Sequence, residues 1–282
     1  MTVNIINKKT VSFNILSYIK SLLLLMKPRV MSLVIFTSAV GLLTAPSVVS
    51  FKDSIIGIFF VAMGAGAAGA LNMWYEADLD KLMTRTCLRP IPTGKVNRSH
   101  ALIFGILLSI ISVYGLYYFT NTISAILLFS TISFYLFVYT IWLKRLTPQN
   151  IVIGGAAGAL PPVIGWTIAT NSLSFEPITF FLIIFYWTPS HFWALSLYKA
   201  QDYEKAKIPM LPIVILPYYI GFTGKIFLFT SLFLTLYYNY ICYDLLKFKK
   251  NKFELNKAKK VFSYSILYLF LIFVLFLIDS LF

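Results

Sequence analysis

The chain has 282 residues, of which 59% are apolar and only 12% are charged. Because soluble domains carry about 25% charged residues, this composition excludes a water-soluble globular protein, a disordered chain and a disulfide scaffold. The 24 basic and 10 acidic residues give a net charge of +14. In so apolar a chain, this excess indicates basic loops on the cytoplasmic side of a membrane rather than a nucleic-acid partner.

Eight apolar stretches are candidates for membrane-spanning helices, since one crossing needs about 20 residues. The eighth stretch, residues 213–246, is too long for one upright helix and too short for two comfortable ones. We therefore predict an all-α, polytopic transmembrane helical bundle with eight clear spans and a possible ninth. The other seven stretches each predict one span, at residues 30–47, 54–75, 101–119, 123–143, 151–168, 178–198 and 261–278.

The distribution of basic residues predicts the orientation of the bundle. They gather before the first span and after the second, fourth and sixth spans, as the positive-inside rule requires of cytoplasmic loops. Residues 1–26 are thus expected to form a cytoplasmic N-terminal segment, and residues 27–282 a single transmembrane domain. The lysine-rich stretch at 247–260 would be cytoplasmic only if residues 208–246 cross twice. A single crossing would place it outside, and the sequence leaves both alternatives open.

Acidic residues form a first cluster at the cytoplasmic end of the second span. Asn72, Glu76 and Asp80 recur every four residues and would share one helix face, whereas Asp78 would point elsewhere. Such oxygen-bearing side chains repel one another in a low-dielectric site unless a cation lies between them. Mg²⁺ prefers these ligands and completes its shell with water and phosphate. The alternative is a solvated helix end, but a buried Asn72 amide would be costly there.

Two further groups of polar residues predict the rest of a diphosphate site. Arg85 and Arg89 follow the first acidic cluster in a proline-rich turn, and a guanidinium can grip phosphate oxygens at two points. A purely topogenic basic loop would not need the acids beside it. Asp202 and Glu204 follow the sixth span, and we expect Asp202 to be a second metal ligand. Taken alone, this second cluster is equally consistent with a solvated loop.

His191 is the only histidine at the depth of the membrane. It follows Pro189, which frees a backbone carbonyl and is expected to kink the sixth span. A polar side chain within lipid is a candidate for a functional site. The imidazole could ligate haem iron, act as a base, or simply form a hydrogen bond with a neighbouring helix.

Six motifs in chain order resemble the UbiA-type intramembrane prenyltransferases, and within them the branch that farnesylates haem. They cover most of the chain from residue 27 to residue 212. The chain departs from that pattern at Cys87, which is often basic there, at Ser190, and after Pro212, where about one helix is missing. The motifs lie at residues 27–30, 72–94, 139–145, 160–166, 191–195 and 202–212.

The resemblance implies a bundle of about nine spans that transfers a farnesyl group from farnesyl diphosphate to a vinyl group of haem B. Water addition would complete the product haem O, and diphosphate would leave. The implied cofactor is Mg²⁺, held by the catalytic residues Asn72, Glu76, Asp80 and Asp202. The implied location is the bacterial inner membrane, with a downstream haem A synthase or terminal oxidase assembly as partner. The expected substrate-binding residues are Arg29, Arg85, Arg89, Tyr139, Lys144, Arg145, His191 and Lys199.

Two other functions are weighed against this one. A related transferase could use an aromatic quinone precursor as acceptor, but the motif around His191 favours haem. An ion-coupled transporter would favour charges near the middle of the membrane. Here the acids lie at cytoplasmic helix ends, which suits a charged diphosphate with an apolar tail.

Overall fold

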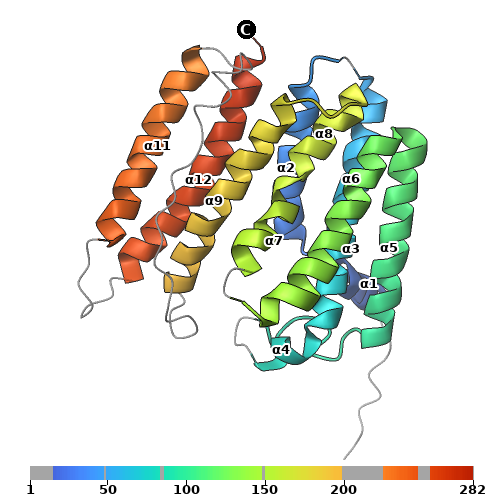
Figure 1. Ribbon diagram of the computed structural model, residues 1–282. Coiled ribbons are helices and arrows are strands. Elements are labelled where there is room, and N and C mark those ends of the chain that lie inside the picture. Colours follow the sequence, from blue (N-terminus) through green and yellow to red (C-terminus); the bar gives the residue numbers. More distant parts are fainter. Residues whose placement is uncertain are drawn as a thin grey trace, which may run out of the picture.

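Each of the eight apolar stretches contains a helix in the computed structural model, which describes residues 15–47, 49–82, 86–147, 150–198, 225–246 and 255–281 (Figure 1). These residues contain no strand. In chain order the elements are α1 (Ile15–Leu25), α2 (Pro28–Leu43), α3 (Phe51–Tyr75), α4 (Ala77–Leu82), α5 (Arg98–Phe119), α6 (Thr122–Ser133), the π-helix η1 (Phe134–Trp142), the 3₁₀ turn η2 (Leu143–Arg145), α7 (Asn150–Ala159), α8 (Pro161–Thr170), α9 (Glu176–Tyr198), α11 (Lys225–Leu246) and α12 (Leu255–Asp279).

Fewer helices meet the requirements of a membrane span than the sequence predicted. Within the described residues, five stretches are long and apolar enough to cross a membrane, and the bent pair α1–α2 is a sixth candidate. The structure therefore confirms an all-helical protein with several membrane-length helices, but eight clear spans is more than it shows. The five stretches are 51–75, 98–119, 122–142, 150–170 and 256–279.

Polar side chains mark where three of these helices begin. Ser50, Asn97 and Asn121 precede α3, α5 and α6, and each side chain accepts a hydrogen bond of 2.9–3.1 Å from a backbone N–H two or three residues further on. Such caps satisfy backbone donors that the first helical turn leaves without partners. The caps therefore fix the points at which the chain enters the bundle.

α2 and α8 approach each other so closely that only glycine fits between them. A Cβ atom on Gly165 would lie 1.9 Å from the backbone oxygen of Ser38, and one on Gly41 would lie 2.0 Å from that of Pro162. Backbones that pack this closely gain dispersion contacts along both helices, as small residues commonly allow in membranes. This contact anchors α2, whose first turn leads into the candidate site.

The two ends of the bundle differ in chemistry. α3 ends at the same end of the bundle where α4 lies and α5 begins, at the bottom of Figure 1. We call it the acid end because Glu76 and Asp80 lie there. The opposite end holds the turns at residues 44–47, 120–121 and 171–175.

Ring contacts show how α9, α11 and α12 run. Phe180 in α9 and Phe227 in α11 both pack against Phe276 near the end of α12, with centroid distances of 4.7 and 4.4 Å. At the other end of this group, Lys257 donates to Asp244 over 3.2 Å. α11 therefore runs toward the acid end and α12 runs back (Figure 1). The helix ends that flank the lysine-rich stretch thus lie with the other basic loops, while residues 199–224 lie outside the described part.

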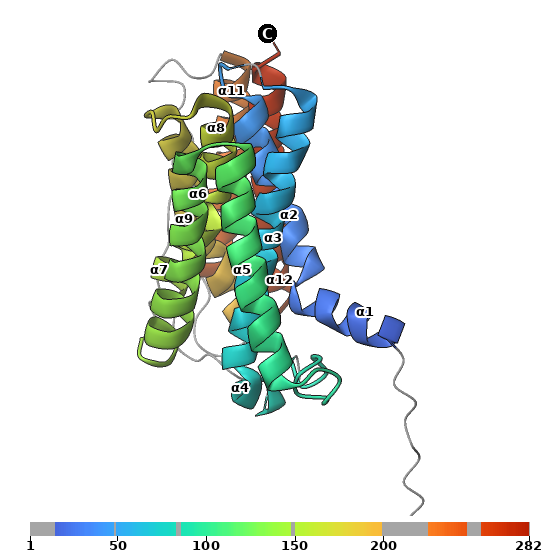
Figure 2. The ribbon, with the colours of Figure 1, turned by 90° about the vertical axis from the view of Figure 1, so that its right-hand side faces the viewer.

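A sharp break separates α1 from α2 at Lys27. This residue has a left-handed backbone with φ of 54°, which is uncommon for any residue but glycine. Pro28 starts α2, and a proline disfavours a helical conformation in the residue before it. The two axes differ by 53°, so α1 runs sideways from the bundle near the acid end (Figure 2).

Candidate active site

Asn72, Glu76 and Asp80 lie along one helical face, which we call the acid face. The N–H of Glu76 donates to the carbonyl of Asn72 over 3.0 Å, and the N–H of Asp80 donates to that of Glu76 over 2.9 Å. Helical hydrogen bonding thus continues across the junction of α3 and α4. All three side chains are buried, with 2–4% exposed. Asp78 points away from them and forms an exposed ion pair with Arg98 at 3.3 Å.

Basic side chains from two other segments contact the upper part of the acid face. Lys27 Nζ donates to Asn72 Oδ1 over 2.5 Å. Lys144, in η2, forms an ion pair with Glu76, and its ammonium lies 5.5 Å from the centre of the Tyr139 ring. One lysine ammonium group therefore contacts a buried amide oxygen, and the other contacts a buried carboxylate.

Asp80 is paired by the turn that follows α4. Arg89 Nη1 lies 2.8 Å from both carboxylate oxygens, and Thr86 donates to the Asp80 backbone carbonyl over 3.0 Å. The hydroxyl and the guanidinium together hold this turn against the helix. Each member of the acid face thus faces one basic residue, and the three basic residues come from three separate segments.

The donor set of the acid face fits a magnesium ion. Its members are two carboxylates and one amide oxygen, which are the hard oxygen ligands that Mg²⁺ takes. The buried Glu76 Oε1 faces the Lys144 ammonium in an ion pair and has no further hydrogen-bond donor among the described residues. The described residues contain no group of three or more His, Cys, Asp or Glu side chains that could hold a metal ion by themselves. Water and substrate phosphate would have to complete the shell.

A π-helix forms the wall opposite the acid face. Thr140 in η1 accepts a hydrogen bond from Asn72 Nδ2 over 3.1 Å and donates to the carbonyl of Tyr135 over 2.8 Å. The ring of Tyr139 lies against Gly154 in α7, where a Cβ atom would come within 2.1 Å of it. Wide helical turns of this kind are rare and frequent at functional sites.

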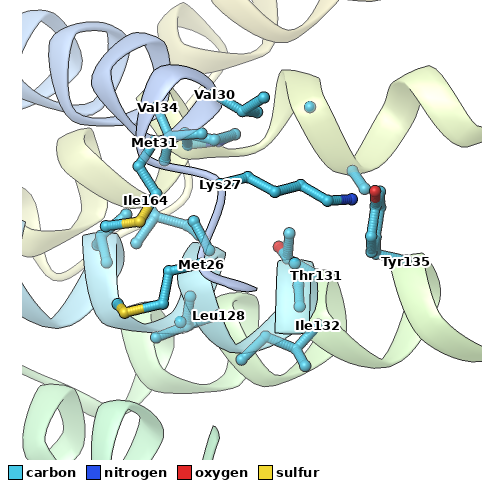
Figure 3. Close-up of a pocket in the computed structure, with 18 residues that line it drawn as sticks. Met26, Lys27, Val30, Met31, Val34, Leu128, Thr131, Ile132, Tyr135 and Ile164 are labelled. Carbon is cyan, nitrogen blue, oxygen red and sulfur yellow. The ribbon is translucent and has the colours of Figure 1, made fainter. Parts of the chain in front are cut away.

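An apolar pocket opens beside the acid face. It has a volume of about 120 Å³ and lies between α2, α3, α6, η1, the end of α7 and the start of α8. Lys27 extends along it toward Tyr135, so that the charged end of one side chain reaches across an otherwise apolar space (Figure 3). The apolar lining includes Met26, Met31, Val34, Leu128, Ile132 and Ile164.

His191 belongs to a second cluster, between α9 and α12. Its Nδ1 lies 2.6 Å from Ser265 Oγ, and its ring stacks on Trp187 with centroids 4.3 Å apart. Phe192 and Phe262 pack against the same ring at 5.3 and 4.7 Å. The hydrogen bond to a neighbouring helix that the sequence allowed is therefore present, and the structure does not bring His191 into contact with the acid face.

Of the remaining predicted site residues, two lie in described elements and three lie outside the described residues. Arg29 is exposed in the first turn of α2, and Arg145 ends η2. Arg85, Lys199 and Asp202 lie outside the described residues, so their assignments stay predictions.

Sequence reasoning missed two residues that contact Asn72. Lys27 lies in the motif at residues 27–30 and was not among the expected site residues, although the proline after it signals a break that can turn a side chain inward. Thr140 lies in the motif at residues 139–145, but nothing in that motif indicated a contact with Asn72, which lies 68 positions away. Only the packing of η1 on α3 brings them together.

Membrane-length helices surrounding an apolar pocket, with a buried acid face and paired cations at its edge, define an integral membrane protein suited to a ligand with a charged head and an apolar tail. The sequence model of the UbiA prenyltransferase family matches residues 33–248. The chain belongs to the UbiA prenyltransferase family.

Relatives and solved structures agree with this assignment. The chain is 71% identical to the protoheme IX farnesyltransferase of Pelagibacter ubique, over 91% of each protein, and 48% identical to protoheme IX farnesyltransferase 2 of Mesorhizobium japonicum, over 91% of this chain and 88% of that protein. A structure described for digeranylgeranylglyceryl phosphate synthase has a TM-score of 0.74 at 17% identity and covers 93% of this chain and 98% of that one. A UbiA homolog from Archaeoglobus fulgidus bound to DMAPP and Mg²⁺ has a TM-score of 0.53 at 13% identity, covering 93% and 95%. These two structures share the fold.

Proposed function

We propose that the protein transfers the farnesyl group of farnesyl diphosphate to a vinyl group of haem B, giving haem O and diphosphate. The observation that carries this proposal is the buried acid face with its cations beside an apolar pocket. Identity of 71% to a protoheme IX farnesyltransferase supports haem as the acceptor. A quinone precursor as acceptor and ion-coupled transport are both less favoured, because the relatives named above are haem farnesyltransferases.

The reaction is a balanced substitution and addition. The bond between farnesyl C1 and the diphosphate oxygen breaks, and the electron pair leaves with diphosphate. The vinyl π electrons of haem B form the new bond to C1, and the resulting cation beside the macrocycle takes up water and loses a proton. Groups that stabilise the departing negative charge lower the barrier most.

The basic residues of the site supply part of that stabilisation. Lys27, Arg89 and Lys144 already lie at the acid face, and diphosphate oxygens could take the places of their present partners. Arg29, Arg85, Arg145 and Lys199 are proposed as further contacts to substrate. The ring of Tyr139, beneath Lys144, presents a π face that favours positive charge.

Asn72, Glu76 and Asp80 would hold Mg²⁺ together with Asp202, which lies outside the described residues. When bound, the ion neutralises diphosphate charge and makes the group a better leaving group. The Archaeoglobus homolog bound to DMAPP and Mg²⁺ supports the same combination here. The apolar pocket would take the farnesyl chain.

Hydrogen bonding at His191 favours a role toward haem. Ser265 Oγ lies 2.6 Å from both the Phe262 carbonyl, which can only accept, and His191 Nδ1. When the Ser265 proton points to Phe262, the imidazole carries its proton on Nδ1, and Nε2 keeps its electron pair. Ligand histidines typically have their other ring nitrogen held in this way. We propose that Nε2 faces the haem iron or the porphyrin edge.

The finer topology belongs to the same proposal. The chain would cross the bacterial inner membrane eight or nine times, with residues 1–26 as a cytoplasmic segment, residues 27–282 as one domain and the acid end facing the cytoplasm. Basic loops at that end support this orientation. Haem O would pass to a downstream haem A synthase or terminal oxidase assembly.

Haem extracted from membranes tests the proposal directly. Membranes that contain the protein, supplied with haem B, farnesyl diphosphate and Mg²⁺, should form haem O, and membranes without it should not. Prenylation of an added quinone precursor instead of haem would favour the other acceptor. No prenylated product of either kind would contradict the proposal.

A further inference from the structure

Thr140 is a small, 1% exposed residue of η1 to which the proposed reaction assigns no part. We propose that Thr140 is a positioning residue, which fixes the side-chain amide of Asn72 so that its oxygen, and not its nitrogen, faces the metal. This inference rests on the function proposed above, because it gives Asn72 a ligand to bind.

Three hydrogen bonds form one directed chain through the site. Lys27 Nζ donates to Asn72 Oδ1 over 2.5 Å, Asn72 Nδ2 donates to Thr140 Oγ1 over 3.1 Å, and Thr140 Oγ1 donates to the carbonyl of Tyr135 over 2.8 Å. These three hydrogen bonds connect the break between α1 and α2 to the helix α3 and the π-helix η1.

Which group donates and which accepts in each of these hydrogen bonds follows from the number of protons available. A threonine hydroxyl has one proton, and a backbone carbonyl can only accept. Because the Thr140 proton is committed to Tyr135, only oxygen lone pairs remain to face Asn72. The amide must therefore turn its NH₂ group toward Thr140. At the other end, an ammonium only donates, so Lys27 demands the amide oxygen, and both ends select the same orientation.

The orientation matters because the two ends of an amide differ chemically. Oδ1 can bind a cation, whereas an NH₂ group would repel it. Asn72 is 2% exposed, so water cannot compensate for a reversed amide. When Lys27 moves to a diphosphate oxygen, only Thr140 still holds the amide in the binding orientation. We therefore expect Thr140 to matter most in the loaded site.

The test compares hydroxyl-bearing and hydroxyl-free side chains at position 140. Thr140→Val keeps the branched shape and removes the hydroxyl, and Thr140→Ser keeps the hydroxyl. Thr37→Val is the matched control, since the hydroxyl of Thr37 is buried and donates to carbonyls of its own helix at 3.0 and 3.3 Å. Binding of Mn²⁺ is measured by electron paramagnetic resonance in purified protein with a non-cleavable thio analogue of farnesyl diphosphate. The Mg²⁺ dependence of haem O formation is measured in parallel.

We expect Thr140→Val to weaken Mn²⁺ binding about tenfold, as is usual for groups that orient metal ligands. The Mg²⁺ concentration for half-maximal activity should rise in step. The serine variant should stay near the wild type and Thr37→Val should not change. If Thr140→Val does not fold, Thr140→Ala carries the same comparison.

Unchanged Mn²⁺ binding in a folded valine or alanine variant would overturn the inference, as would a serine variant as weak as valine. Wild-type protein that binds no Mn²⁺ and forms no haem O would instead contradict the proposed function. The two failures are therefore distinguished by the wild-type measurement.

Discussion

Asp80 is the acidic residue whose pairing is most complete, since one Arg89 nitrogen contacts both of its oxygens at 2.8 Å. Asp80→Asn keeps the shape of the side chain and removes its negative charge. We expect haem O formation to fall by roughly 100-fold, the effect typical of a lost electrostatic group at a reaction centre. Extracted haems are quantified by chromatography, and immunoblots should show the variant in the membrane.

Asp78→Asn is the control for this change, because Asp78 is exposed and points away from the acid face. It should retain nearly full activity. Normal haem O formation by Asp80→Asn would reject the assignment of Asp80 as a metal ligand.

A variant of Arg89 can show whether this residue contacts diphosphate directly or only contributes a charge that determines topology. Arg89→Lys preserves the positive charge but loses the planar fork. The KM for farnesyl diphosphate should rise about tenfold, as expected for a lost charge-assisted hydrogen bond. Steady-state assays in detergent measure this value.

Arg98→Lys is the matched control, since Arg98 lies in an exposed ion pair, and its KM should not change. An equal KM in both variants would show that Arg89 does not contact the diphosphate directly.

His191 offers a test of the haem position. His191→Ala should shift the absorption spectrum of bound haem and weaken its binding roughly tenfold, as loss of an iron ligand or its support does. His100→Ala serves as the control, because His100 pairs with Tyr18 near the start of α5. A His191→Ala protein with an unchanged haem spectrum and normal product would exclude the role.

Among the elements, the contact of α2 with α8 decides how firmly the site is anchored. Gly165→Ala would place a methyl group 1.9 Å from the Ser38 carbonyl, and overpacking of this kind costs about 1–3 kcal/mol. The melting temperature in detergent should fall.

Gly158→Ala provides the comparison, because no atom lies within 4 Å of the added Cβ and alanine favours helix by up to ~1 kcal/mol. Its melting temperature should stay level or rise. A Gly165→Ala protein as stable as Gly158→Ala would show that this close approach is not essential.

For the whole molecule, the orientation in the membrane can be tested by single cysteines at its two ends. In a background without Cys87 and Cys242, Leu88→Cys reports the acid end and Ser172→Cys the opposite end, and both sites are exposed. A membrane-impermeant maleimide should label position 172 in intact spheroplasts and position 88 only in inverted vesicles. The reverse pattern would contradict a cytoplasmic acid end.

The sequence by itself determined the class of the protein and much of the acid face. Apolar stretches gave the positions of the helices, because a span must be continuous in sequence. The four-residue spacing of Asn72, Glu76 and Asp80 placed them on one face, because helical period is a local property. The number of clear spans was overestimated, since α9 and α11 are long enough but carry many Tyr, Trp and polar residues, and they do not meet the apolar requirement of a membrane span.

Only the tertiary structure decided which groups meet. Lys27 and Lys144 each pair with a different member of the acid face, and nothing local to these two residues selects the partner. Thr140 reaches Asn72 across 68 positions and His191 reaches Ser265 across 74. Such contacts depend on how whole helices pack, and packing is set by the shapes of surfaces that come from distant parts of the chain.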